Sequence, residues 1–376
     1  MNHRKIFIHI GTHKTGTKSL QTFLGNRIKE LRRQGILYPR TGWNLYHAPA
    51  QHNIAWELAE VPHFDPHLGT IRDLRAELSR HDGNVVISSE DFTGAIHNHA
   101  RFTDFLNLLR TDGFDIVLVL FLRNQASHVI SMYHMFLRLG YELDFGEFLD
   151  SICTLGGVNY RHWQIPYHYD RYIETLLAFP AELCIRSYDS GRRHDNLLEV
   201  FLKACGIDGA LFRDAVLPQE NTGLTVWEGL RAFHLARFGH VTPALDAVFD
   251  VAEYSLPDCN PYRRHEQVRL EECFGESNQR LHKLWGIELD PLLSSEQTGE
   301  RPLTSMSELF STEFHKLLSS MTALDQVACL EREALRLRTH YESTLTWRLS
   351  APLRAIPGHL RKIAKSAKGF FYLRAL

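Results

Sequence analysis

Four short apolar runs, each followed by a segment with helical periodicity, constrain the fold of this chain more than any other feature. They lie at residues 5–10, 85–88, 116–122 and 182–187. Continuous rather than alternating apolar residues are typical of strands that are buried on both faces of a parallel sheet. Strands that alternate with amphipathic helices build an α/β sandwich. We therefore expect a three-layer α/β core over about residues 1–210, with helices on both faces of a central parallel sheet.

The second half of the chain has a different pattern. From about residue 224 the segments are aromatic, rich in histidine and helical in period, so we expect a helical part at 224–310 that completes one domain over 1–310. Residues 311–376 are then expected to form an amphipathic helix and a basic tail. The tail, from 347 onward, carries seven Lys or Arg and no Asp or Glu.

Composition narrows the class of protein. A formal net charge of -2 on 376 residues gives no indication of a nucleic-acid partner. The longest aliphatic run has seven residues, whereas a membrane span needs about 20, and the apolar N-terminal run is too short for a signal peptide. Six cysteines without a C-x-x-C pair indicate buried free thiols in a reducing compartment. We expect a cytoplasmic protein.

A glycine-containing loop, Gly11-Thr-His-Lys-Thr-Gly-Thr-Lys-Ser19, lies between the first predicted strand and the first predicted helix. Ligands of parallel α/β sheets bind at such points, where a helix N-terminus offers free amides. The glycines permit close backbone approach to a phosphate, and Thr15, Thr17 and Ser19 can donate from their hydroxyls. Lys14 adds a positive charge. The loop is predicted to bind phosphate.

The loop is P-loop-like but departs from the Walker A pattern, in which a lysine would replace Thr17. Residues 13–21, His-Lys-Thr-Gly-Thr-x-Ser-Leu-Gln, resemble the 5′-phosphosulfate loop of sulfotransferases that use 3′-phosphoadenosine-5′-phosphosulfate (PAPS), especially the bacterial branch. Many relatives have Thr or Ser in place of Lys18, so the role of Lys18 stays open. The resemblance implies that the nucleotide is held by Gly11, His13, Lys14, Thr15, Gly16, Thr17, Lys18 and Ser19.

A second motif places Arg123 at the end of a predicted strand and Ser131 eight residues later in the next predicted helix. The pair resembles the 3′-phosphate motif of the same family, in which an Arg and a Ser bind the phosphate that distinguishes PAPS from ordinary nucleotides. The guanidinium fork suits that task because it offers paired donors to phosphate oxygens. Two phosphate motifs in family order favour a PAPS-dependent sulfotransferase.

Sulfuryl transfer is expected to resemble phosphoryl transfer, with an in-line transition state stabilised by positioning and by cations. The resemblance implies that Lys14 stabilises the departing nucleotide. No metal is required, and no metal-ligand spacing is evident.

Glu90, which follows the run at 85–88, is the candidate base, as glutamate is in the sulfated-glycan and tyrosylprotein branches. The alternatives are a carboxylate that only fixes its loop, or a histidine base, as in the cytosolic branches. The rival histidines are His13, His97, His99, His134 and His162.

The acceptor is indicated only by the end of the chain. Residues 345–354 resemble a short segment that recurs at the ends of bacterial surface-polysaccharide enzymes, and basic and aromatic residues follow it. The expected acceptor is thus a hydroxyl or amine of a carbohydrate or glycolipid, and the tail could contact the inner face of the membrane or be a solvated coil. The alternatives are a P-loop nucleotide-dependent kinase and a non-catalytic partner in surface-glycan assembly.

Overall fold

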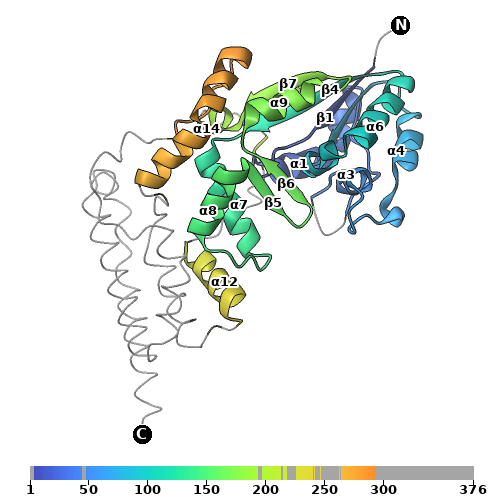
Figure 1. Ribbon diagram of the computed structural model, residues 1–376. Helices are drawn as coiled ribbons and strands as arrows, with labels where there is room; N and C mark the ends of the chain where they lie inside the picture. The colour runs from blue at the N-terminus through green and yellow to red at the C-terminus, as the bar shows by residue number, and fades with distance from the viewer. Residues whose placement is uncertain are drawn as a thin grey trace, which may run out of the picture. The chain divides into compact units, whose positions relative to one another are not determined.

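The core of the protein is a five-stranded parallel sheet with the strand order β2-β3-β1-β4-β7 (Figure 1). The computed structural model describes residues 4–44, 48–193, 197–212, 215–217, 226–239, 241, 246, 262 and 264–292. The central strand β1 pairs with β3 on one side and β4 on the other, with Ile8 opposite Ile87 and Leu118. The strands are β1 (Arg4–His9), β2 (Ile36–Leu37), β3 (Asn84–Ser88), β4 (Phe114–Leu122) and β7 (Glu182–Ser187).

Helices cover both faces of this sheet, which confirms the predicted three-layer α/β sandwich. One apolar core joins the sheet to α1 (Thr17–Asn26), α2 (Ile28–Arg33), α11 (Leu197–Ala204) and η2 (Gly209–Phe212). The opposite core joins it to α3 (His52–Ala59), α4 (Ile71–Leu78), α5 (Phe92–His97), α6 (His99–Thr111) and α9 (Tyr169–Leu177). Successive residues of β1 alternate between the two cores, since Ile6 and Ile8 face one and Phe7 faces the other. This explains why the strand is continuously apolar.

The connections that leave β1 and β3 diverge at the carboxyl ends of these neighbouring strands. The chain leaves β1 for α1 on one face of the sheet and leaves the neighbouring β3 for α5 on the other face. Neighbouring strands whose connections diverge in this way form the usual ligand site of an open α/β sheet. The loop of residues 10–16 and the segment 89–91 therefore meet at one edge.

Two parts of this region differ from the sequence prediction. The single helical segment expected after the first strand is broken at Arg27, which lies between α1 and α2. An antiparallel hairpin, β5 (Gly157–Tyr160) and β6 (Trp163–Pro166), was not expected from the sequence. It packs on α5 and on α8 (Phe145–Leu155), which follows α7 (Gln125–Leu137) (Figure 1).

The chain divides into two compact units, Met1–Leu224 with Pro261–Glu300 and Thr225–Asn260 with Arg301–Leu376. The first unit also contains η1 (Pro66–Leu68), α10 (Tyr188–Arg193) and α14 (Arg264–Trp285), and the second contains α12 (Val226–Phe238). The expected boundary at residue 310, the amphipathic helix and the basic tail lie outside the described residues and stay predictions.

Two further predictions concern the membrane and the cysteines. No helix in the described part of the chain is both long and apolar enough to cross a membrane. Four cysteines are described, and all are free thiols. Cys205 is buried as expected, whereas Cys153, Cys184 and Cys273 are only half-buried. Cys259 and Cys329 lie outside the described residues.

Candidate functional site

The loop after β1 continues the sheet for three residues and then turns into α1. The backbone amides of Ile10 and Thr12 donate to the carbonyls of Val119 (3.0 Å) and Phe121 (2.9 Å) on β4. Lys14 (φ 61°) and Gly16 (φ 75°) then adopt the left-handed conformation, which turns the chain sharply. Gly16 is the N-cap of α1 and provides no side chain to cap it. The first amides of the ten-residue helix, at residues 17–19, can therefore bind an anion.

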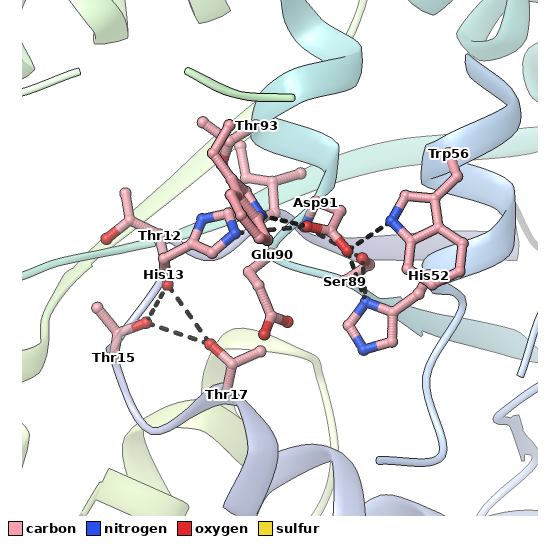
Figure 2. A network of polar contacts seen from close by, with 12 residues as sticks. Thr12, His13, Thr15, Thr17, His52, Trp56, Ser89, Glu90, Asp91 and Thr93 are labelled. Atoms are coloured by element: carbon pink, nitrogen blue, oxygen red, sulfur yellow. Dashed lines mark hydrogen bonds and ion pairs between the residues drawn. The ribbon is translucent and has the colours of Figure 1, made fainter. Parts of the chain in front are cut away.

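The threonine hydroxyls hold the loop together rather than facing a ligand (Figure 2). Thr15 Oγ1 donates to the carbonyl oxygen of Thr12 at 2.6 Å, and Thr17 Oγ1 lies 3.4 Å from the same oxygen. Both side chains are buried. In this conformation the two residues offer backbone amides to a phosphate, and their predicted donation from the hydroxyls stays a prediction that needs a rearranged loop.

Arg123 connects the second predicted motif to the loop. Its Nη1 donates to the backbone carbonyl of Lys14 at 2.9 Å, and its guanidinium lies over the ring of Tyr188, 5.3 Å from the centroid. Burial lowers the pKa of Lys14 to about 8, helped by the charges of Arg138 and Arg123 and opposed by Glu90. The two motifs, 109 positions apart, thus form one cationic cluster.

The helix α7 extends this cluster. Ser131, His134 and Arg138 are spaced three and four residues apart, which places them along one face of α7 and its C-cap. Burial lowers the pKa of His134 to about 4, and the charges of Lys14 and Arg138 add to the shift, so this face lies toward the phosphate loop. Ser131 is half-buried in the second turn of α7. Its predicted contact with a 3′-phosphate stays a prediction.

Glu90 follows β3 and lies against the start of the phosphate loop. A Cβ added at Gly11 would be 3.2 Å from both Cα and Cβ of Glu90, and Gly11 has a φ of 92°, so only glycine fits there. The carboxylate Oε2 accepts a hydrogen bond from Nε2 of Gln21 on α1 at 2.9 Å. Glu90 is half-buried and points toward the loop of Thr15 and Thr17 (Figure 2). The structure therefore brings the predicted base close enough to Lys14 for its charge to act on the pKa of the lysine.

The neighbouring Asp91, which the sequence analysis passed over, is a buried junction between four elements (Figure 2). Its Oδ2 accepts from Trp56 Nε1 (2.8 Å) and contacts His52 Nδ1 (3.1 Å), both on α3. Its Oδ1 lies 3.4 Å from Nε2 of His13 in the phosphate loop and 3.3 Å from Nε1 of Trp163 on β6.

Opposing effects act on the pKa values in this cluster. Burial alone would raise the pKa of Asp91, but hydrogen bonds and positive charge from His52 and His13 hold it well below its usual range. Burial alone would lower the pKa of His52, but the hydrogen bond to Asp91 and the charges of Glu90 and Asp91 raise it. Asp91, rather than Glu90, is the carboxylate that fixes this loop, and the loop-fixing alternative considered for Glu90 fits its neighbour better.

The remaining predicted residues lie outside the centre of the site. Lys18 is exposed and Ser19 is half-buried on the first turn of α1. His97 and His99 are exposed at the junction of α5 and α6, and His162 lies in the hairpin with its ring 4.7 Å from that of His63. No group of three potential metal-ligating side chains occurs within the described residues.

Comparisons with known proteins do not assign the chain to a family. No protein-family model and no curated protein match the chain. A solved structure from the PezAT chromosomal toxin-antitoxin system of Streptococcus pneumoniae matches 73% of this chain and 88% of its own at 14% identity, with a TM-score of 0.25. A TM-score this low carries no argument about function, so the α/β architecture rests on the sheet itself.

Several residues of this site gave little or no signal in the sequence. Arg138 could have been found from its spacing of seven after Ser131, which places it on the same helical face. Gln21 belongs to the loop motif, but only the tertiary structure shows that it contacts Glu90. Asp91 looks like an ordinary loop residue until three segments of the chain are folded around it.

Proposed function

We propose that this protein is a sulfotransferase that moves the sulfuryl group of PAPS to a hydroxyl or amine of an acceptor. One observation carries the proposal: the hydrogen bond from Arg123 Nη1 to the Lys14 carbonyl, which joins the two motifs that resemble PAPS-binding sequences. A donor with a 5′-phosphosulfate and a 3′-phosphate requires two anion sites at a fixed separation. The amides of α1 with Lys14, and Arg123 with Ser131, are these two sites in the proposal.

The geometry supports in-line displacement. The acceptor oxygen or nitrogen forms a bond to sulfur while the bond from sulfur to the bridging oxygen of the 5′-phosphate breaks, and that oxygen keeps the electron pair. Lys14 stabilises the negative charge that develops on the leaving phosphate. The acceptor proton goes to Glu90, which is close enough to Lys14 for its charge to act on the pKa of the lysine. Atoms and charge balance without a further reactant, and this scheme needs no metal.

The acceptor and the location are further parts of the proposal. The acceptor is a carbohydrate or glycolipid, a class indicated only by the resemblance at residues 345–354. The protein acts in the cytoplasm, with its basic tail at the inner face of the membrane, where anionic lipids attract positive charge.

The test is nucleotide binding by the purified full chain. 3′-Phosphoadenosine 5′-phosphate, the product nucleotide, should raise the melting temperature at concentrations where AMP and ADP have little effect, since only it occupies both anion sites. Transfer of labelled sulfur from PAPS to a panel of cell-surface glycans then tests activity. Preference for ATP over the 3′-phosphorylated nucleotide would favour the kinase alternative. Selective binding of the product nucleotide without transfer to any acceptor would favour a non-catalytic partner in surface-glycan assembly.

A further inference from the structure

Gln21 is a buried amide in direct contact with the proposed base. It lies on α1 and is 1% exposed. Its Nε2 is 2.9 Å from Oε2 of Glu90 and 3.3 Å from Oγ of Ser88. An ionised carboxylate accepts hydrogen bonds and donates none, so the amide must present its NH₂ group to Glu90. Gln21 therefore donates to Oε2 of Glu90 and fixes that side of the carboxylate.

The support beneath Gln21 is itself fixed. Ser88 Oγ lies 2.8 Å from Nδ1 of the fully buried His9, and the Ser88 backbone amide donates to Oε1 of Gln51 at 2.8 Å. Two strands and the loop before α3 thus hold the serine to which Gln21 is anchored. An amide that is anchored to this serine through its NH₂ group holds the same group in place for Glu90, which makes it suitable for aiming that side chain.

The contact leaves one carboxylate oxygen for chemistry. Gly11 fits closely against the backbone of Glu90, and Gln21 engages Oε2. Among the described residues, Oε1 accepts no hydrogen bond. A base of this kind needs one oxygen to be oriented and the other to be open toward the acceptor.

The same helix carries both functions. The N-terminal amides of α1, beginning at Thr17, form the proposed site for the 5′-phosphate, and Gln21 lies one turn further along the helix. Any shift of α1 on donor binding would move the amide that orients Glu90. Donor binding and the aim of the base are therefore mechanically linked through a single rigid element.

We propose that Gln21 is a positioning residue that aims the free oxygen of Glu90 at the acceptor; this rests on the proposed sulfuryl transfer. Gln21→Met keeps the length of the side chain and removes the donor. It should lower kcat by about 10- to 100-fold, the effect of losing one hydrogen bond to a charged group, with little change in KM for PAPS.

The experiment compares three full-length variants with the natural chain. Gln21→Met and Gln21→Glu test the contact, and Gln164→Met, at an exposed position of β6, is the matched control. Because Gln21→Glu replaces the donor with a carboxylate beside Glu90, it should lower kcat at least as much as Gln21→Met. This variant tests the contact even if Gln21→Met folds poorly. A retained rise in melting temperature with 3′-phosphoadenosine 5′-phosphate verifies that each variant is folded.

A second measurement is independent of activity. With ¹³C-labelled glutamate, the carboxyl signal that disappears in Glu90→Gln can be followed in each variant. A changed chemical shift of this signal in both Gln21 variants, but not in Gln164→Met, would support the contact. An unchanged signal and an unchanged kcat would overturn the positioning role. If the natural chain transfers no sulfuryl group, the proposed function fails, while the carboxyl signal still decides whether Gln21 contacts Glu90.

Discussion

Arg123 and Lys14 are joined by a hydrogen bond from the guanidinium of one to the backbone carbonyl of the other, at 2.9 Å. The arginine thereby holds the loop that carries the lysine and adds positive charge beside it. Burial, together with the charges of Arg138 and Arg123, lowers the pKa of Lys14 to about 8. A polyanionic ligand at this site would compensate the positive charge.

Arg123→Lys should weaken the binding of 3′-phosphoadenosine 5′-phosphate by about 10-fold or more, because a lysine offers a point charge in place of a donor fork. Binding of AMP should change far less, since AMP has no 3′-phosphate. Isothermal titration calorimetry measures both constants. Arg110→Lys, on the exposed side of α6, is the matched control. Equal losses of affinity for the two nucleotides would mean that Arg123 only supports the loop.

The activity should fall in alkaline solution because Lys14 must be protonated to stabilise the leaving group. Burial lowers the pKa of Lys14 to about 8, with Arg138 and Arg123 contributing, so kcat/KM for PAPS should decline above about pH 8. Arg138→Gln removes one of the positive charges and should move this alkaline limb to higher pH. Arg110→Gln should leave it in place. If Arg138→Gln does not move the alkaline decline of kcat/KM, a group other than Lys14 causes that decline.

Glu90→Gln should lower kcat by about 100- to 10,000-fold, the usual contribution of a general base, because the amide cannot accept the acceptor proton. Affinity for 3′-phosphoadenosine 5′-phosphate should stay within a few-fold of the natural value. Single-turnover transfer from labelled PAPS measures the chemical step, and calorimetry measures binding. Normal turnover in this variant would move the role of base to a histidine, and His13 and His134 would then be replaced in turn.

Asp91→Asn should lower the free energy of unfolding by about 3 kcal/mol, since it breaks a buried charged network by removing one partner. The pKa of Asp91 is lowered on folding from 3.8, so its contribution is present above that pH and is lost in stronger acid. The pKa of His52 is raised from 6.5, so its contribution is present below 6.5 and is lost as the pH rises through the folded value.

The stability difference between the natural chain and Asp91→Asn should therefore be larger near pH 5.5 than near pH 8.5. Urea unfolding at both values measures it. Asp104→Asn, at an exposed position of α6, controls for loss of a carboxylate. A difference that does not depend on pH would mean that His52 does not share its proton with Asp91.

Much of the fold was predictable from local pattern. The four apolar runs became β1, β3, β4 and β7, because an element that is buried on both faces must be apolar along its whole length. The hairpin at 157–166 was missed because its strands are short and bear aromatic and polar residues without clear alternation. The break between α1 and α2 at Arg27 does not show in the apolar periodicity, which continues from α1 into α2.

The sequence by itself determined the sheet, the phosphate loop and the pair Arg123 and Ser131, since each depends on spacing within one segment. Only the tertiary structure decided that Arg123 contacts Lys14, that Gln21 contacts Glu90, and that Asp91 rather than Glu90 fixes its loop. These contacts join residues from 35 to 109 positions apart. Such pairs meet because parallel strands bring their carboxyl ends to one edge, a consequence of strand order that periodicity along the chain does not encode.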